Sequence, residues 1–219
     1  MTSDLLAPQQ QRSRDTLARL LSSTIAMLEK HGLGGATIPR IASAASVAPA
    51  SVYRRFRDRD ALYRAAFLSA LAKSAEADRL LNLEAFKKHT LEGVVRELVG
   101  AIIQQYRSHR RLLTALTRFL EDDDDQRFRK RVLAIVAGNF RTLIELVLGF
   151  RAQIAHPDPE RAVAFGLLSA ASSIELRALD QLSVWREVLP ISDQELQAEL
   201  TRSFLAYLYS KAPVHPGGK

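Results

Sequence analysis

The sequence predicts an all-α protein in which three short N-terminal helices precede a larger helical body. Apolar residues recur at helical spacing, and the first helix shows this most clearly in the stripe Leu17, Leu21, Ile25 and Leu28. The period-two alternation that is typical of strands is nearly absent. Hydrophobic residues make up 47% of the chain, which is enough for a substantial core, and there is no cysteine to form a disulfide.

The first helix is expected from about Ser13 to Lys30, after a polar arm of residues 1–11 that we expect to be disordered. Gly32 ends this helix, and the glycine-rich GLGG forms a loop. A second helix follows Thr37, a good N-cap residue, with Pro39 in its first turn, where proline is tolerated.

The third helix is expected to begin at Pro49, after a tight turn at residues 45–47. Helix-start signals also mark the body, namely a cap at Asp58, a cap at Asp158 and a capping box at Ser192 and Glu195. The expected body helices are Arg59–Leu81, Thr90–Arg107, Arg110–Glu121, Gln126–Ile154, Pro159–Leu182 and Asp193–Tyr209, and the tail 212–219 is expected to be disordered.

The chain has a formal net charge of +7, and the positive density is highest near the N-terminus. The first 60 residues carry nine Lys and Arg against five Asp and Glu, whereas the longer remainder carries 22 against 19. A basic balance favours a polyanionic partner, either nucleic acid or an acidic membrane surface. No signal peptide is recognisable, and the uncharged run between Arg161 and Glu175 is shorter than the roughly 20 residues of a membrane span. We therefore expect a cytoplasmic protein with no membrane partner.

The stretch VAPASVYRRF, residues 47–56, places basic and aromatic residues on one short helix. At about 100° per residue, Val52 and Phe56 share the face that can pack on the first two helices. Ser51 and Arg54 then point outward. Tyr53 and Arg55 lie on the two flanks of the helix. This arrangement is typical of a helix in a DNA major groove, where an arginine binds a guanine edge and the flanks contact phosphates. The alternative is a basic helix that is only solvated surface.

The segment from about Arg14 to Phe67, with the motif GGATIPRIASAASVAPASVYRRFRDRDALY, resembles the tetracycline-repressor (TetR) family of bacterial transcriptional regulators. It matches that family's threonine-led second helix, turn, Tyr-x-x-Phe recognition helix and start of helix four. The resemblance implies an N-terminal three-helix DNA-binding domain with a helix-turn-helix over residues 12–58. It also implies a larger helical ligand-binding and dimerisation domain over residues 59–211.

Five residues of the matching segment depart from the family pattern. Leu28 takes a frequent phenylalanine position and Arg59 a frequent lysine position, and the other three lie in the turn and the start of the third helix. Ser46 stands where the family usually has glycine in the turn, and a serine held at positive φ should cost about 1 kcal/mol. Ala48 replaces a frequent serine cap, so a cap worth roughly 1 kcal/mol is missing. Pro49 replaces a frequent lysine or arginine, which removes one possible DNA contact.

The resemblance also implies roles for single residues. Ser51 and Arg54 are expected to face bases, while Tyr53 and Arg55 are expected to contact phosphates or the groove edge. Arg12 and Arg14 could extend the contact along the DNA, unless they belong to a disordered arm. The expected DNA-binding residues are Thr37, Ser51, Tyr53, Arg54, Arg55 and Arg59.

In the family that the sequence resembles, the C-terminal domain forms the dimer. Gly166, Ala170 and Ser173 make a small-residue face at helical spacing, which lets helices approach closely. Leu200 and Phe204 belong to an apolar stripe on the last helix. We expect these five residues at a homodimer interface, and the alternative is an intrachain core.

The same domain is expected to hold an unidentified small-molecule effector. Four aromatic residues and one arginine are candidates for this pocket, although each aromatic is also a candidate for plain core. They are Tyr106, Arg107, Phe119, Phe140 and Trp185.

Signatures of catalysis are missing from the sequence. It has no G-x-S-x-G, H-E-x-x-H or Walker motif, and its histidines are never three or four apart, so we expect neither a metal nor another cofactor. The acidic run Glu121–Asp125 is interpreted as a loop and a helix start.

The expected function is a ligand-responsive transcriptional regulator, with a repressor favoured over an activator. Its homodimer would bind a double-stranded DNA operator with inverted-repeat symmetry, and a small molecule would release it. One alternative is a helical protein–protein interaction module without sequence-specific DNA binding. Another is a small helical enzyme that uses unrecognised side chains.

Overall fold

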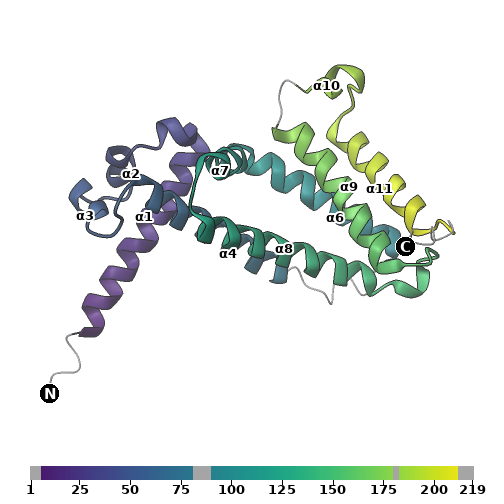
Figure 1. Cartoon of the computed structure of the whole chain (residues 1–219), viewed down its shortest axis with the longest axis horizontal. Coiled ribbons are helices and arrows are strands. Elements are labelled where there is room, and N and C mark those ends of the chain that lie inside the picture. Colours follow the sequence, from purple (N-terminus) through teal and green to yellow (C-terminus); the bar gives the residue numbers. More distant parts are fainter. Residues whose placement is uncertain (1–5, 81–89, 180–182, 212–219) are drawn as a thin grey trace. The chain divides into compact units, whose positions relative to one another are not determined.

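The computed structural model describes residues 6–80, 90–179 and 183–211 (Figure 1). Every regular element within these residues is a helix, which confirms the predicted all-α fold. Three helices at the N-terminal end are followed by longer ones, in the expected order.

Packing contacts divide the chain into two compact units. The first unit contains residues 1–74 and 111–135, and the second contains residues 75–110 and 136–219. The first unit therefore holds more than the three short helices. It also includes most of α4 (Arg59–Leu80), nearly all of α7 (Arg110–Asp122) and the start of α8 (Gln126–Leu148). The assignment of DNA binding to residues 12–58 and of ligand binding and dimerisation to residues 59–211 stays a prediction.

Helix α1 (Leu6–Gly35) begins earlier than expected. Residues 6–11 are helical rather than part of a disordered arm, because leucine, alanine and glutamine are good helix formers and Pro8 lies in the first turn. Gly32 interrupts the helix with a φ of 64°, as its position in the sequence suggested, and one further turn continues to Gly35.

Helix α2 (Ile38–Ala44) packs on α1, and α3 (Pro49–Tyr53) packs on α2. The turn between α2 and α3 is held by the Val47 N–H, which donates to the Ala42 carbonyl at 3.0 Å. Ser46 in this turn has a φ of 55°, a left-handed conformation that favours glycine. The strain expected for a serine at this position is therefore present in the structure.

Helix α4 is anchored at its N-terminal end. The Asp58 carboxylate accepts the N–H of Ala61 at 2.7 Å, which confirms the predicted cap. The buried Tyr63 hydroxyl lies 2.6 Å from the Ala36 carbonyl and 3.1 Å from the Leu33 carbonyl, so it ties α4 to the end of α1. The first unit also contains an aromatic cluster, Tyr63, Phe67, Phe119 and Phe128, whose ring centroids are 5.5–6.5 Å apart in the contacting pairs.

The second unit is built on α6 (Leu91–Ser108), α9 (Pro159–Leu179) and α11 (Asp193–Leu208), which pack against one another. The predicted capping box of α11 is present, and Asp158 accepts the N–H of Arg161 at 3.1 Å, which confirms its role as a cap of α9. The expected helix ends at Leu81 and Leu182 lie outside the described residues.

Two short elements of the second unit were not expected. Helix α8 ends at Leu148 rather than at Ile154, because Gly149 follows and a 3-10 turn, η1 (Arg151–Gln153), replaces the last helical turn. The brief helix α10 (Trp185–Val188) lies between α9 and α11.

Among the described residues, one helix, α9, is long and apolar enough to cross a membrane when only length and composition are counted. The uncharged run within α9 is shorter than a membrane span, but the helix as a whole meets the criteria of length and composition. The buried side of α9 packs against α6 and α11.

Candidate nucleic-acid interface

Helix α3 is attached to the first unit by one fully buried side chain. Val52 has no exposed surface, and Phe56, one turn later, is half-buried. Pro49 is the first helical residue, as predicted, and Ala48 occupies the N-cap without a side-chain hydrogen bond. Because the apolar side is anchored, the other side of this short helix is presented outward.

The expected base-facing residues are linked to each other. Arg54 Nη2 donates a hydrogen bond to Ser51 Oγ at 2.7 Å. Arg54 is the C-cap residue of α3, which ends at Tyr53, and it is exposed, while Ser51 within the helix is partly exposed. This hydrogen bond limits the rotamers of a long side chain, and a guanidinium held in this way keeps donors free for a guanine edge.

The expected flanking residues are also exposed, but Arg55 has a partner that the sequence did not predict. Its Nη1 donates to Ser13 Oγ of α1 at 3.1 Å. Tyr53 has 58% of its surface exposed. An open hollow lies beside this contact and is lined by Thr16, Val47, Ser51, Arg54 and Arg55. Hydroxyls at positions 13 and 16 of α1 are the only sequence signal that could have suggested this neighbour.

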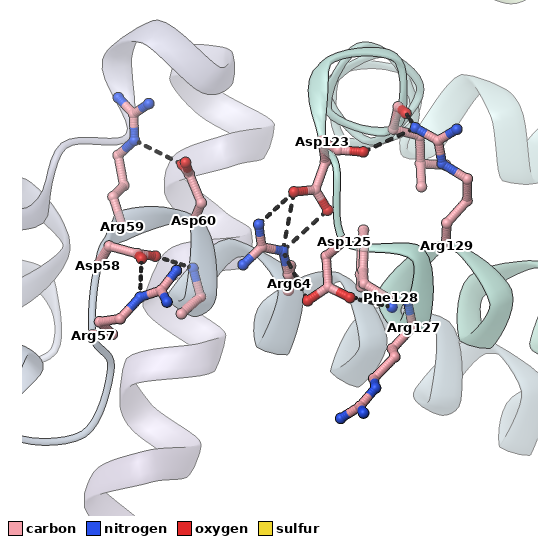
Figure 2. A network of polar contacts seen from close by, with 12 residues as sticks. Arg57, Asp58, Arg59, Asp60, Arg64, Asp123, Asp125, Arg127, Phe128 and Arg129 are labelled. Atoms are coloured by element: carbon pink, nitrogen blue, oxygen red, sulfur yellow. Dashed lines mark hydrogen bonds and ion pairs between the residues drawn. The ribbon is translucent and has the colours of Figure 1, made fainter.

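The residues at the start of α4 add further charged side chains to the candidate interface. Arg57 donates to Asp58 at 2.8 Å, and this bond together with the one from the Ala61 N–H lowers the pKa of Asp58, the backbone bond being the larger cause. The exposed Arg59 guanidinium lies 5.4 Å from the centre of the Tyr63 ring and 3.4 Å from the carboxylate of Asp60 (Figure 2). The aromatic ring and the carboxylate hold Arg59 near the helix start without burying its charge.

Thr37 occupies the predicted N-cap position of α2, but its side chain makes no capping hydrogen bond. The predicted capping role of the hydroxyl is therefore wrong. The residue is exposed, and its backbone carbonyl accepts the N–H of Ile41 at 2.9 Å. A phosphate contact by this hydroxyl stays a prediction.

Comparison with known proteins is consistent with this geometry. Residues 20–66, which contain α2, α3 and the turn between them, match the family model of the tetR family of bacterial regulatory proteins. The match covers the segment of residues 20–66, which is similar to the DNA-binding segment of the TetR family. The proteins of that family are described as bacterial regulatory proteins. Comparison with curated proteins finds no match.

Solved structures match along most of the chain. A TetR-family transcriptional regulator from Mesorhizobium loti is 18% identical, with a TM-score of 0.59, and the match covers 90% of this chain and 96% of that one. FadR from Bacillus subtilis in complex with stearoyl-CoA is 16% identical, with a TM-score of 0.54 and coverages of 90% and 99%. RolR in complex with resorcinol is 18% identical, with a TM-score of 0.52 and coverages of 88% and 89%. At these identities the matches show a common fold.

The residues predicted to line an effector pocket lie in different environments. Phe119 lies in the aromatic cluster of the first unit, with 8% of its surface exposed, whereas the other four lie in the second unit. Arg107 is exposed and paired with Asp193 at 2.6 Å, and Trp185 has 56% of its surface exposed on α10. Phe140 is half-buried on α8.

Tyr106 is the predicted pocket residue with the most unusual environment. It is half-buried, and burial raises the pKa of Tyr106 to about 12, with a further contribution from the nearby Glu175 carboxylate, which accepts its hydrogen bond. The phenol is therefore a hydrogen-bond donor at neutral pH.

The residues predicted at the dimer interface are mostly core. Gly166, Ala170 and Phe204 are buried within this chain where α9 meets α11, so these three are not available to a second copy in this structure. Ser173 is exposed and Leu200 is half-buried. The small-residue face does allow a close helix approach, but the two helices belong to the same chain.

Proposed function

We propose that this protein is a cytoplasmic repressor of the TetR type, which binds an inverted-repeat operator as a homodimer and is released by a small molecule. The observation that carries the proposal is the outward side of α3. Tyr53 at the end of α3 is exposed, as are Arg54 and Arg55 in the turn that follows it, while the buried Val52 fixes the helix to its scaffold. This is the arrangement of a recognition helix that enters a major groove.

The proposed contacts follow from chemistry and exposure. Arg54, held by Ser51, binds a guanine edge, whereas Tyr53 and Arg55 bind phosphates beside the groove. Arg59 and Thr37 are exposed at the starts of α4 and α2, and we assign both to phosphate contacts.

The homodimer is supported by a largely exposed apolar face on α9, of which Phe165 also contacts Tyr207 of α11 at 5.3 Å between ring centroids. Phe165, Leu168 and Leu176 have 52%, 59% and 44% of their surface exposed, on the side of the helix away from the buried glycine and alanines. We propose this face, in place of the buried small-residue face, as the dimer surface. A two-fold dimer would place its recognition helices roughly 34–36 Å apart, in successive major grooves, and its operator would be an inverted repeat.

Release by an effector is supported by the fold alone. The structures of FadR with stearoyl-CoA and of RolR with resorcinol show two proteins of similar fold in complex with small organic molecules. A 100-fold loss of operator affinity requires about 2.7 kcal/mol of coupling, which is within the usual range for allosteric proteins. The second unit is the proposed location of the effector.

The test is selection of duplexes from a random DNA pool by the purified full chain. The selected sequence should be an inverted repeat, and its affinity should fall steeply as the salt concentration rises. The number of protein chains bound per duplex, measured by analytical ultracentrifugation, should be even. A chain that selects no sequence and shows no salt-sensitive duplex binding would instead favour the protein–protein interaction module.

A further inference from the structure

The junction between α7 and α8, residues 120–129, is a capped turn (Figure 2). Asp125 Oδ1 accepts the N–H of Arg127 at 2.9 Å and that of Phe128 at 3.0 Å, which starts α8. Arg129 Nη2 donates to the carbonyls of Leu120 and Asp123 at 2.8 and 2.9 Å, which satisfies groups at the end of α7. The end of α7 and the start of α8 are thus both capped by charged side chains, which hold the α7–α8 junction in one conformation.

Arg64 of α4 forms an ion pair with this α7–α8 junction. Its Nε lies 3.0 Å from Asp123 Oδ2, and its Nη2 also donates to Asp123 Oδ1, so the contact is bidentate. Asp125 adds a second carboxylate at 3.8 Å from Nε. Only 5% of the Asp123 side chain and 21% of the Arg64 side chain are exposed, so water and salt screen the pair weakly. Figure 2 shows the guanidinium directed toward both carboxylates.

The residue before Arg64 bonds a different element. The Tyr63 hydroxyl reaches the carbonyls of Leu33 and Ala36 at the end of α1, and its ring contacts Phe119 of α7 at 5.9 Å between centroids. A single turn of α4 is therefore fixed on one side to the three-helix group and on the other to the α7–α8 junction. That turn follows the recognition helix after a connection of only a few residues, 54–58.

Building on the proposed function, we infer that Arg64 and Asp123 are positioning residues for DNA binding. Their bidentate pair holds the first turns of α4, and through them α3, in the orientation that the operator requires. Neither residue belongs to the outward side of α3, so the pair acts through the backbone that it fixes. The α7–α8 junction is then part of the DNA-reading scaffold, although it lies about 60 residues away in sequence.

This role has a signature that distinguishes it from a DNA contact. Loss of a phosphate contact lowers the slope of log Kd against log salt by about one. Loss of a positioning pair weakens binding but leaves the slope unchanged, because the same number of phosphates is neutralised once the complex forms.

The experiment measures operator affinity by fluorescence anisotropy at several salt concentrations for the full-length chain and its variants. Asp123→Asn, Arg64→Gln and the double variant are compared with wild type on the selected duplex, after melting curves show that each is folded at the assay temperature. Each single change should weaken binding by about tenfold or more, and the double should be no weaker than the singles, because the pair acts as one unit. The salt slope should not change.

A matched control is the exposed pair of Arg151 and Glu160, which lie 3.0 Å apart. Arg151→Gln should leave operator affinity unchanged. If Arg64→Gln does not fold, Arg64→Lys replaces it, since lysine keeps the charge but not the fork that meets two carboxylate oxygens. That variant should lose affinity by a smaller factor, and wild-type affinity would count against the inference.

Two further results would overturn the inference. One is wild-type affinity in folded Asp123→Asn, and the other is a salt slope reduced by about one in Arg64→Gln, which would make Arg64 a phosphate contact. If the proposed function itself were wrong, the wild-type chain would select no duplex. The two failures can therefore be distinguished.

Discussion

Gly166 of α9 lies so close to the ring of Phe204 of α11 that a Cβ atom added to the glycine would overlap the ring. Both residues are buried, and Phe204 has only 3% of its surface exposed. The two helices therefore approach each other at a distance that only glycine permits at this position.

We expect Gly166→Ala to lower the free energy of unfolding by about 1–3 kcal/mol, because a methyl group overpacks a filled core. The matched control is Gly138→Ala on α8, where an added Cβ meets nothing within 4 Å. That change should stabilise by roughly 0.5–1 kcal/mol through helix propensity. Urea unfolding followed by circular dichroism measures both, and equal effects of the two alanines would contradict the steric account.

The small-residue face on α9 shows what periodicity can and cannot predict. Spacing alone predicted that Gly166, Ala170 and Ser173 share a face and allow close packing. It could not tell whether the partner helix came from the same chain or from a second copy, because an apolar stripe looks identical in both cases. The exposed leucines on the opposite side of α9 became visible only when the tertiary core was known.

Ser46→Gly should raise the free energy of unfolding by about 1 kcal/mol, since glycine adopts the observed φ of 55° without steric cost. The control is Ser43→Gly in the exposed side of α2, which should destabilise by roughly 0.5 kcal/mol because glycine is a poor helix former. Thermal unfolding of both variants checks the signs. A loss of stability in Ser46→Gly would show that the serine hydroxyl contributes more than the strain costs.

Local features of the sequence were the more predictable ones. The caps at Asp58, Asp158 and Ser192 depend on neighbours within three residues, and all three are present. The contact between Arg64 and Asp123 joins residues far apart in the chain, so no local rule could find it. The acidic run was interpreted as a loop and a helix start, which is correct for residues 123–125, but the ion pair of Asp123 was not predicted.

Arg54→Ala should relax base preference at one operator position and cost about 1–3 kcal/mol there, because a bidentate guanine contact is lost. Selection of duplexes by the variant, sequenced beside wild type, measures this. Ser51→Ala is a useful companion, since it removes the hydrogen bond that orients the guanidinium but not the guanidinium itself. A uniform loss of affinity across sequences would show instead that Arg54 binds phosphate.

Arg55→Ala should weaken binding to all sequences alike and reduce the salt slope by about one. The contact of Arg55 with Ser13 suggests a control, because Ser13→Ala frees the guanidinium without removing its charge. If Ser13→Ala weakens binding as much as Arg55→Ala does, the arginine acts by joining α3 to α1 rather than by touching DNA.

Leu168→Arg should convert the proposed dimer to a monomer, since it places a charge in the middle of the exposed apolar face of α9. Sedimentation equilibrium measures the mass. Leu133→Arg on α8 is the control, because Leu133 is similarly exposed at 61% but lies outside that face. A monomeric wild type, or a dimer that persists in the Leu168 variant, would exclude this surface.

Asp123 should make the stability of the protein depend on pH in the acid range. The hydrogen bonds from Arg64 are the main cause that lowers the pKa of Asp123 below its ordinary value of 3.8. A carboxylate with a lowered pKa in the folded state stabilises the fold above its unfolded pKa, and this contribution is lost as the pH falls through the folded value. Asp123→Asn should therefore be less stable than wild type near neutral pH, and the difference should shrink as the pH falls below about 4. Urea unfolding of both proteins from about pH 6 to about pH 3 measures the difference. A difference that stays constant over this range would mean that the charge of Asp123 does not contribute to the contact with Arg64.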